Sequence, residues 1–370
     1  MKSELMLGPW ILGSLYLAIA ILLIANRRIL LSLPFLYLSA MHLPIFPFTL
    51  PVWAQIVTTL VAYLMYIAFW FGGMMTQEEM FLSSSGKRAV LNKYDRHMRD
   101  WPVEYSEKDV ATTFGDIHII DTGKTATSDQ TIVLLHAASM SSWSWKLNRG
   151  ILGNGGRVIA IDLPGEVGKS TLSSLSRPVM SDEDIGLLFS EIFKALEVDS
   201  AILIGASAGG HQAMRIALQM PERVEALCLT GPMGISNPIR PLITMTAGML
   251  APIEPVNRIL TRWALGTSEV IRQEAYQWFH LVLRHVIGRP TAPRQLTDEE
   301  MSAIECPILL ILAEDDNLVG SADAALIRAQ TNFKDIQAHI LPGSHLANLE
   351  QASQVDSLIT GFLRDLESED

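Results

Sequence analysis

The hydrophobic pattern divides the chain into an N-terminal part that is almost continuously apolar and a longer part where short apolar runs alternate with polar segments. Between Glu4 and Arg27 lie 22 residues without a charge, and from Ile29 to Gln77 lie another 49. Because one membrane-spanning helix needs about 20 apolar residues, the second stretch has room for two spans. The pattern therefore predicts a transmembrane region over residues 1–76 with about three helices.

Prolines and basic residues refine this prediction. Three prolines mark a turn inside the second apolar stretch, because proline interrupts the hydrogen bonding of a helix. The expected spans run from about Met6 to Ala25, Ile29 to Leu43 and Val52 to Met75. Basic clusters follow the first and the last span, and the positive-inside rule puts both on the cytoplasmic face. Two crossings then separate the clusters, so we expect an integral membrane protein with its N-terminus outside and its C-terminal part in the cytoplasm.

Two parts of this N-terminal interpretation have alternatives. Residues 1–25 also have the length of a cleaved signal peptide, although no small-x-small cleavage site precedes Asn26. Residues 77–109 form a juxtamembrane segment with an amphipathic helix, whose apolar face includes Leu91, Tyr94 and Met98. That face suits either an anionic lipid surface or packing on the following domain.

From residue 110 onward the pattern changes to eight short apolar runs separated by polar or helical segments. The runs are VATTF, IHIID, TIVLLH, RVIAID, AILIGA, EALCLTG, CPILLILAE and IQAHIL. The later runs are continuously apolar, as strands are when helices cover both faces of their sheet. The alternation of such runs with helical stretches predicts an α/β fold with a mainly parallel sheet.

Composition and charge narrow the function. The net charge is −11, and the mean hydropathy of +0.26 is high for a purely soluble chain. The first 80 residues hold as many acids as bases, so the acidic excess belongs to the rest and argues against a nucleic-acid partner. Cys228 and Cys306 lie in apolar, strand-like runs, as expected of buried free thiols in a reducing compartment. Metal-ligand spacings are missing from the sequence, so neither a metal nor a cofactor is expected.

The stretch DLPGEVGKST, from Asp162 to Thr171, follows an apolar run and resembles the end of a phosphate-binding loop. Such a loop needs glycine five residues before Gly168, where this chain has Leu163. Pro164 also removes a backbone N–H from the intended phosphate cradle. The sequence therefore favours a turn of another kind.

The segment AILIGASAGG combines a strand, a tight turn at Ser207 and the start of a helix. A serine at such a turn is forced into strained backbone geometry, and small residues two positions on either side let strand and helix pass closely. The turn lifts the hydroxyl clear of the sheet and aims the Ala208 N–H at the position of a developing oxyanion. Ser207 is therefore the predicted nucleophile.

A serine nucleophile needs a general base held by a carboxylate, and both occur further along the chain. The run LLILAEDDNLVG ends a predicted strand with Asp315 and Asp316, and LPGSHLANLE follows the last strand with His345. The C-terminal ends of parallel strands meet at one edge of the sheet, so Ser207, an acid and His345 can converge there. Either aspartate fits this reasoning.

With this order of serine, acid and histidine, the chain from about Val110 to Leu366 resembles an α/β-hydrolase of the serine carboxylesterase type. The resemblance implies an eight-stranded, mostly parallel sheet with helices on both faces. It places a hydrolase domain over 110–370, with a helical cap inserted at about 232–298. It also selects Asp316 over Asp315 as the triad acid, and it interprets DLPGEVGKS as a turn near the active-site rim.

The segment HAASMSSWSW, from His136 to Trp145, resembles the oxyanion loop of this family, with Ala137 in place of the usual glycine. The resemblance makes the backbone N–H of Ala138 the second oxyanion donor beside that of Ala208. The expected function is a membrane-anchored serine hydrolase that cleaves small-molecule or lipid esters through an acyl-enzyme. A monoacylglycerol-like substrate, an amidase or C–C bond hydrolase activity, and a ligand sensor without turnover all stay open.

Overall fold

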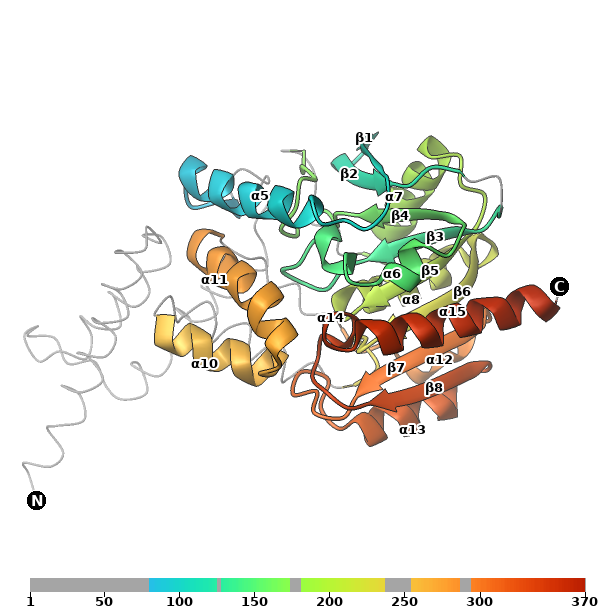
Figure 1. Ribbon diagram of the computed structural model, residues 1–370. Coiled ribbons are helices and arrows are strands. Elements are labelled where there is room, and N and C mark those ends of the chain that lie inside the picture. The colour runs from blue at the N-terminus through green and yellow to red at the C-terminus, as the bar shows by residue number, and fades with distance from the viewer. Residues whose placement is uncertain (1–79, 125–127, 174–180, 237–253, 287–293, 370) are drawn as a thin grey trace, which may run out of the picture.

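A computed structural model describes residues 80–124, 128–173, 181–236, 254–286 and 294–369. An eight-stranded sheet runs through this part of the chain in the order β1-β2-β4-β3-β5-β6-β7-β8 (Figure 1). The strands are β1 (Ser106–Thr112), β2 (Gly115–Asp121), β3 (Thr131–Leu135), β4 (Arg157–Ile161), β5 (Ala201–Ala206), β6 (Val224–Thr230), β7 (Ile308–Ala313) and β8 (Ile336–Leu341). β2 pairs antiparallel with β1 and β4, and all later pairs are parallel. The predicted mainly parallel sheet is confirmed.

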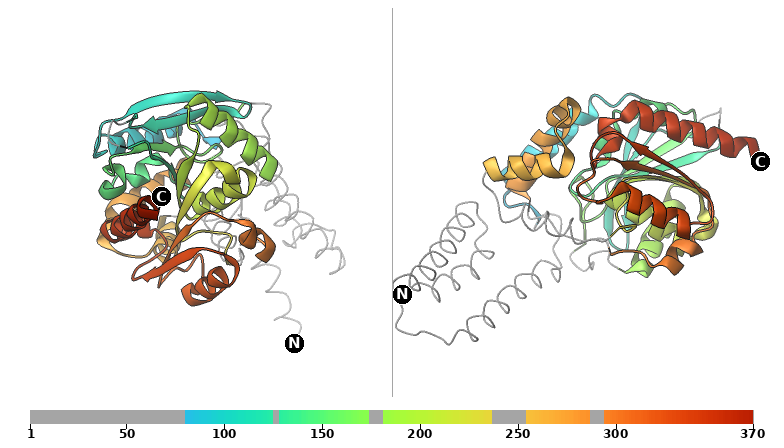
Figure 2. Two further views of the ribbon diagram at one scale, coloured as in Figure 1. Left: turned by 90° about the vertical axis from the view of Figure 1, so that its right-hand side faces the viewer. Right: turned by 90° about the horizontal axis from the view of Figure 1, so that it is seen from below.

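Helices cover both faces of the sheet (Figure 2). They are α5 (Ser84–Met98), α6 (Arg149–Leu152), α7 (Asp182–Ala195), α8 (Ala208–Gln219), α12 (Asp298–Ala303), α13 (Ala322–Asn332), α14 (Ala347–Glu350) and α15 (Ala352–Glu369). Two further helices, α10 (Glu254–Leu265) and α11 (Tyr276–His285), lie beyond the end of the sheet. Alternate residues of each strand face opposite sides. On β3, Ile132 and Leu134 pack toward α5, α6 and α15, whereas Val133 and Leu135 pack toward α7, α8 and α13.

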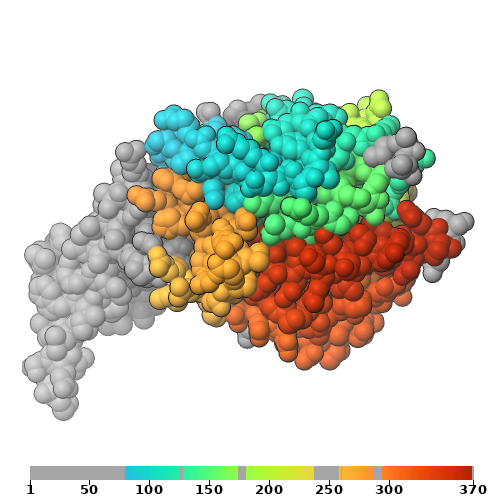
Figure 3. Space-filling view, viewed as in Figure 1, coloured from blue at the N-terminus to red at the C-terminus, as the bar shows by residue number. Residues whose placement is uncertain are grey.

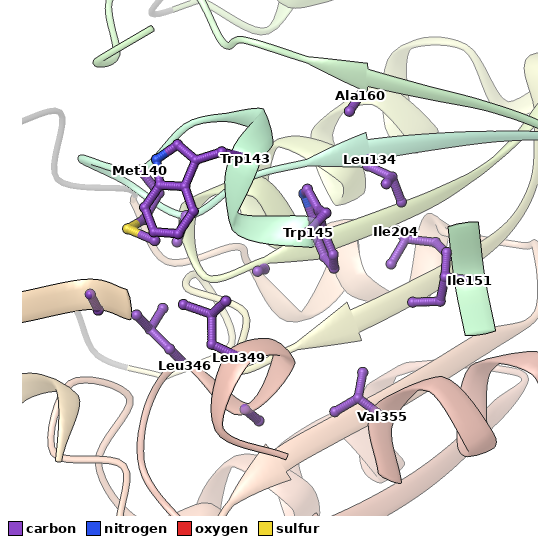
Figure 4. Packing of buried hydrophobic residues seen from close by; sticks show 14 of the residues in the cluster. Leu134, Met140, Trp143, Trp145, Ile151, Ala160, Ile204, Leu346, Leu349 and Val355 are labelled. Atoms are coloured by element: carbon purple, nitrogen blue, oxygen red, sulfur yellow. The ribbon is translucent and has the colours of Figure 1, made fainter. Parts of the chain in front are cut away.

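The core on the first of these faces is built around two tryptophans. A short 3-10 helix, Ser142–Trp145, follows β3 and buries Trp143 and Trp145 completely. Figure 4 shows both rings among aliphatic side chains of β3, β5, α6, α14 and α15. Burying two indole rings of this size removes a large apolar area from water, which fixes the loop after β3 firmly against the sheet.

The domain begins earlier than its hydrophobic pattern predicts. β1 starts at Ser106, and the expected boundary at Val110 lies inside it. The first four side chains of this edge strand are exposed and polar, so hydrophobicity gives no signal there. α5 precedes β1 and buries Val90, Tyr94 and Met98 in the core. The helix therefore packs on the domain, and the alternative of an apolar face on lipid is wrong.

The described part of the predicted cap forms α10, one π-helical turn (Ile271–Ala275) and α11. These elements lie outside the sheet, at the end toward which its parallel strands point (Figure 1). The carbonyl of Trp263 accepts a hydrogen bond from Asn317 after β7, and that of Leu265 accepts one from Ser344 after β8. The helices thus stand over the C-terminal edge of the sheet.

Within the described ranges, the helices are either too short or too polar to cross a bilayer. The three predicted spans belong to residues 1–79, outside the described residues. The spans and the orientation derived from them therefore stay predictions.

Candidate active site

Ser207 occupies the sharp turn between β5 and α8. Its backbone angles are φ 52° and ψ −114°, in a region that side-chain-bearing residues rarely adopt. The Ser207 N–H donates to the carbonyl of Thr230, and the Ser207 carbonyl accepts from the N–H of Met233. The two bonds tie the turn to the end of β6 and the residues just after it, and offset the strain of about 1–3 kcal/mol that such a conformation costs.

Glycines on either side of Ser207 let the strand and the helix approach each other. A Cβ on Gly209 would lie 2.1 Å from the carbonyl oxygen of Leu135 on β3, and a Cβ on Gly205 would lie 2.6 Å from the Gly209 backbone. Real side chains do not make such contacts, so a larger residue at either position forces the backbone to move. The predicted need for small residues at this turn is confirmed.

The structure brings Ser207, Asp316 and His345 together, as the sequence predicts. Nε2 of His345 lies 2.7 Å from Oγ of Ser207, and Nδ1 lies 2.7 Å from Oδ2 of Asp316. Asp316 follows β7 and His345 follows β8, so both side chains come from loops at the C-terminal edge of the sheet. All three are buried, with exposed fractions of 2 to 4%.

Asp316 is held as a charged acceptor. Its Oδ1 accepts the backbone N–H groups of Leu318 and Val319, each at 2.8 Å. Burial raises its pKa, but the nearby His345 and the hydrogen bonds from His345, Val319 and Leu318 outweigh burial and leave the pKa below its usual value. A carboxylate only accepts, so Nδ1 of His345 carries the proton and Nε2 turns its lone pair to the serine hydroxyl. Asp315 is exposed, and the carboxylate that contacts His345 is that of Asp316.

The candidate oxyanion donors follow two neighbouring strands, β3 and β5, at matching positions. Leu135 of β3 pairs with Gly205 of β5, and Ala138 and Ala208 each come three residues later. Ala208 is the first residue of α8, whose N-terminal N–H groups point out of the helix toward the sheet edge. The two N–H groups therefore belong to the same edge of the sheet as the Ser207 hydroxyl.

The loop that carries Ala138 is fixed from two sides. Ser139 has φ 60°, its N–H donates to Oε2 of Glu166 at 2.7 Å, and its carbonyl accepts from the indole Nε1 of Trp278 on α11 at 2.7 Å. Burial raises the pKa of Glu166 to about 7, although the Ser139 N–H acts in the opposite direction. Sequence reasoning missed both partners. Glu166 lies in the DLPGEVGKS turn, but that position alone does not reveal its contact.

The polar groups of the turn from Asp162 to Thr171 contact other groups of the protein. Asp162 accepts the N–H groups of Ser142 and Lys169, at 2.9 and 2.8 Å. The Lys169 ammonium pairs with Asp95 at 2.9 Å and Glu107 at 2.8 Å. Protein carboxylates thus occupy the donors that a phosphate would need, and the turn is a structural loop at the rim of the site.

Other titratable residues near the site have structural roles. His136 is fully buried; its Nε2 accepts the N–H of Leu163 at 2.9 Å, and its Nδ1 lies 2.8 Å from the carbonyl of Ala137. His211 on α8 is buried, and burial lowers its pKa to about 3, so it stays neutral. Among the residues that the structure describes, no group of three or more His, Cys, Asp or Glu side chains is placed to hold a metal ion.

Comparison with known sequences and structures identifies the class of protein. Residues 132–357 match the sequence model of the Alpha/beta hydrolase family, and the chain therefore belongs to that family.

Several relatives share most of this chain. Carboxylesterase YbfK of Bacillus subtilis (strain 168) is 28% identical over 307 residues, which cover 78% of this chain and 98% of the relative. A 2-hydroxy-6-oxononadienedioate/2-hydroxy-6-oxononatrienedioate hydrolase of Burkholderia vietnamiensis (strain G4 / LMG 22486) is 29% identical, over 67% of this chain and 91% of its own length. The crystal structure of naproxen esterase (carboxylesterase NP) from Bacillus subtilis superposes with a TM-score of 0.68 at 24% identity, over 76% of this chain and 99% of that one.

Proposed function

We propose that this protein is a serine hydrolase that cleaves carboxylic esters through an acyl-enzyme. The observation that carries the proposal is the continuous hydrogen-bond chain from Asp316 through His345 to the strained, buried Ser207. The carboxylesterase relatives and the α/β-hydrolase fold support a hydrolase acting on esters.

In the proposed mechanism, Ser207, His345 and Asp316 act in the arrangement that the structure shows. His345 Nε2 takes the hydroxyl proton as Ser207 Oγ attacks the ester carbonyl, and Asp316 stabilises the resulting imidazolium. The N–H groups of Ala138 and Ala208 stabilise the oxyanion of the tetrahedral intermediate. The intermediate collapses as His345 returns the proton to the departing alcohol. A water molecule, deprotonated by the same imidazole, then releases the carboxylic acid and restores the serine.

The proposal also includes attachment to a membrane. Residues 1–76 would anchor the protein by about three spans, with the hydrolase domain on the cytoplasmic side. Support comes from the two long uncharged stretches and from the basic clusters that follow them. An anchored domain with a cap over its active site suits esters that partition into lipid, including monoacylglycerol-like substrates.

The test uses the purified full chain in a neutral detergent and p-nitrophenyl esters of graded acyl length. We expect hydrolysis by the wild type, a fluorophosphonate label on Ser207, and a loss of several orders of magnitude in kcat for Ser207→Ala. Asp316→Asn should lower kcat by about 10⁴-fold, whereas the matched change Asp315→Asn should leave it nearly unchanged. Full activity of Ser207→Ala would refute the assignment, and a preference for acetyl over long acyl chains would contradict the lipid substrate.

A second activity is favoured by one observation. The Burkholderia relative is named for a hydroxy-oxo-dicarboxylate, which contains no ester. Cleavage of such a compound breaks a C–C bond, and the same three side chains can assist it. Assaying a 2-hydroxy-6-oxo-dienoate beside the esters separates the two activities. We expect the ester to give the larger kcat/KM.

A further inference from the structure

A cavity of about 450 Å³ is lined by residues of α5, α10, the π-helical turn Ile271–Ala275 and α11. Figure 3 shows the three helices together at one end of the described part of the molecule. Five cationic side chains line the cavity: Lys93, Arg96, Arg258, Arg262 and Arg272. Its lining includes no carboxylate among the described residues, in a chain whose net charge is −11.

Two nearby glutamates already have partners. Glu274 pairs with Lys146 at 2.8 Å, on the core side of the cap, and Glu269 pairs with Arg272. The Lys93 ammonium donates to the amide oxygen of Gln277 at 3.1 Å, which adds no negative charge. Glu269 thus neutralises one cation of the lining, whereas Glu274 is directed to Lys146, outside the lining.

The mutual effect of these cations is visible at Lys93. Its pKa is lowered by burial and by the charges of Arg96 and Lys146, with Glu274 acting in the opposite direction. An anion bound in the cavity would offset the repulsion between these cations, and its binding free energy would include an attraction to each cation of the lining. Arginine is suited to this role because its planar guanidinium donates in pairs to phosphate oxygens.

We propose that the cavity between α5, α10 and α11 binds the phosphate group of a phosphorylated ligand. Three arginines line the cavity from α10 (Arg258, Arg262) and from the π-helical turn (Arg272), and two cations line it from α5, so the phosphate would lie between side chains of separate elements. The Ser207 hydroxyl, the His345 imidazole and the Asp316 carboxylate take no part in this binding. The proposed phosphate site is therefore separate from ester hydrolysis and does not depend on that activity.

The phosphate can come from a soluble ester or from a phospholipid headgroup. α10 also exposes Ile259 by 65% and Trp263 by 41%, one helical turn apart and next in sequence to Arg258 and Arg262. An aliphatic and an indole side chain beside arginines are typical of a helix at a lipid headgroup layer. This neighbourhood makes a headgroup phosphate the source that we expect.

The experiment measures binding to the full chain in a neutral detergent by isothermal titration calorimetry. The probes are inorganic phosphate, glycerol 3-phosphate, and detergent micelles doped with phosphatidic acid, with diacylglycerol-doped micelles as the uncharged comparison. Arg258→Gln/Arg262→Gln removes two cavity charges. Lys194→Gln/Arg364→Gln removes two exposed charges from α7 and α15 and is the matched control. Arg96→Gln tests the cations of α5 independently.

We expect saturable 1:1 binding to the wild type, weakened about tenfold or more by Arg258→Gln/Arg262→Gln and by Arg96→Gln, and changed less than about twofold in the control. Binding of the soluble phosphates identifies a free ligand, and binding of the phosphatidic acid micelles alone identifies a headgroup. Absence of saturable binding to every probe, or equal weakening in cavity and control variants, would overturn the proposal. Hydrolysis of p-nitrophenyl acetate by the same samples shows separately whether the catalytic assignment fails.

Discussion

Replacing Glu166 by alanine tests how the loop that carries Ala138 is held in its strained shape. The wild-type carboxylate accepts the Ser139 N–H at 2.7 Å, and Ser139 has φ 60°. A hydrogen bond to a charged acceptor contributes about 1.5–3 kcal/mol, and the left-handed backbone costs about 1–3 kcal/mol. The bond is therefore of the size needed to keep the loop in place.

If the free energy of the lost hydrogen bond is lost entirely from transition-state stabilisation, 1.5–3 kcal/mol corresponds to a decrease of about 10- to 150-fold in kcat/KM. Glu166→Gln keeps an acceptor oxygen and should lose less than about fivefold. Adding Ser139→Gly to Glu166→Ala should restore part of the activity, because glycine adopts a positive φ without strain. Such a rescue would not occur if Glu166 acted only through overall stability.

The role of Glu166 also predicts the direction in which kcat/KM changes with pH. The pKa of Glu166 is about 7, so its carboxylate becomes charged and its bond to Ser139 strengthens as the pH rises through 7. The wild type should gain kcat/KM over this interval, and Glu166→Gln should lose that component of the profile. The assay is p-nitrophenyl butyrate hydrolysis from pH 5.5 to 9. Glu191→Ala, which removes a carboxylate that accepts the Thr113 N–H far from the site, is the control. Wild-type kinetics of Glu166→Ala at every pH would refute the reasoning.

Three further changes have defined outcomes. Asp121→Asn breaks a buried ion pair with Arg157 and should lower the free energy of unfolding by about 3 kcal/mol, measured in urea at pH 7. Hydrogen bonds from Arg157 hold the pKa of Asp121 far below 3.8 in spite of burial. The ion pair therefore contributes its full stability above pH 3.8 and loses it as the pH falls further. Gly209→Ala places a Cβ against the Leu135 carbonyl and should abolish activity while circular dichroism reports a shifted or unfolded domain. Trp278→Phe keeps an aromatic ring but not the indole N–H, and should lower kcat/KM by about tenfold. Because Trp278 is fully buried, the smaller ring also leaves a cavity and should lower the melting temperature.

The sheet was predictable because its signal is local. Each of the eight apolar runs contributes to a strand, and the inner strands are apolar at consecutive positions because helices cover both of their faces. The polar start of β1 escaped because an exposed edge strand has no such requirement. α5 was recognisable as amphipathic, but its pattern did not say whether lipid or protein covers it. Only the packing of Tyr94 against the core distinguishes the two.

The convergence of Ser207, Asp316 and His345 was predictable for a different reason. Parallel strands place the residues that follow them at one edge, so the positions depend on topology and not on fine geometry. The contacts of Ser139 were not predictable in this way. Trp278 is 139 residues away from it in the sequence, and the two meet only because the cap folds back over the loop after β3. Such a contact leaves no periodic pattern in either segment.

The contacts between the residues before α5 and the end of α11 have a mechanical consequence. Phe81 forms an isolated antiparallel bridge with Val286, Leu82 donates its N–H to the carbonyl of His285, and Gly86 admits the His285 ring where a Cβ would lie 2.9 Å from it. The stretch before α5 is thus fastened to the end of α11, ahead of the first strand in the chain. α11 is also the helix whose indole N–H, from Trp278, holds the loop beside the nucleophile. A displacement of Phe81 and Leu82 would therefore act on that loop through α11.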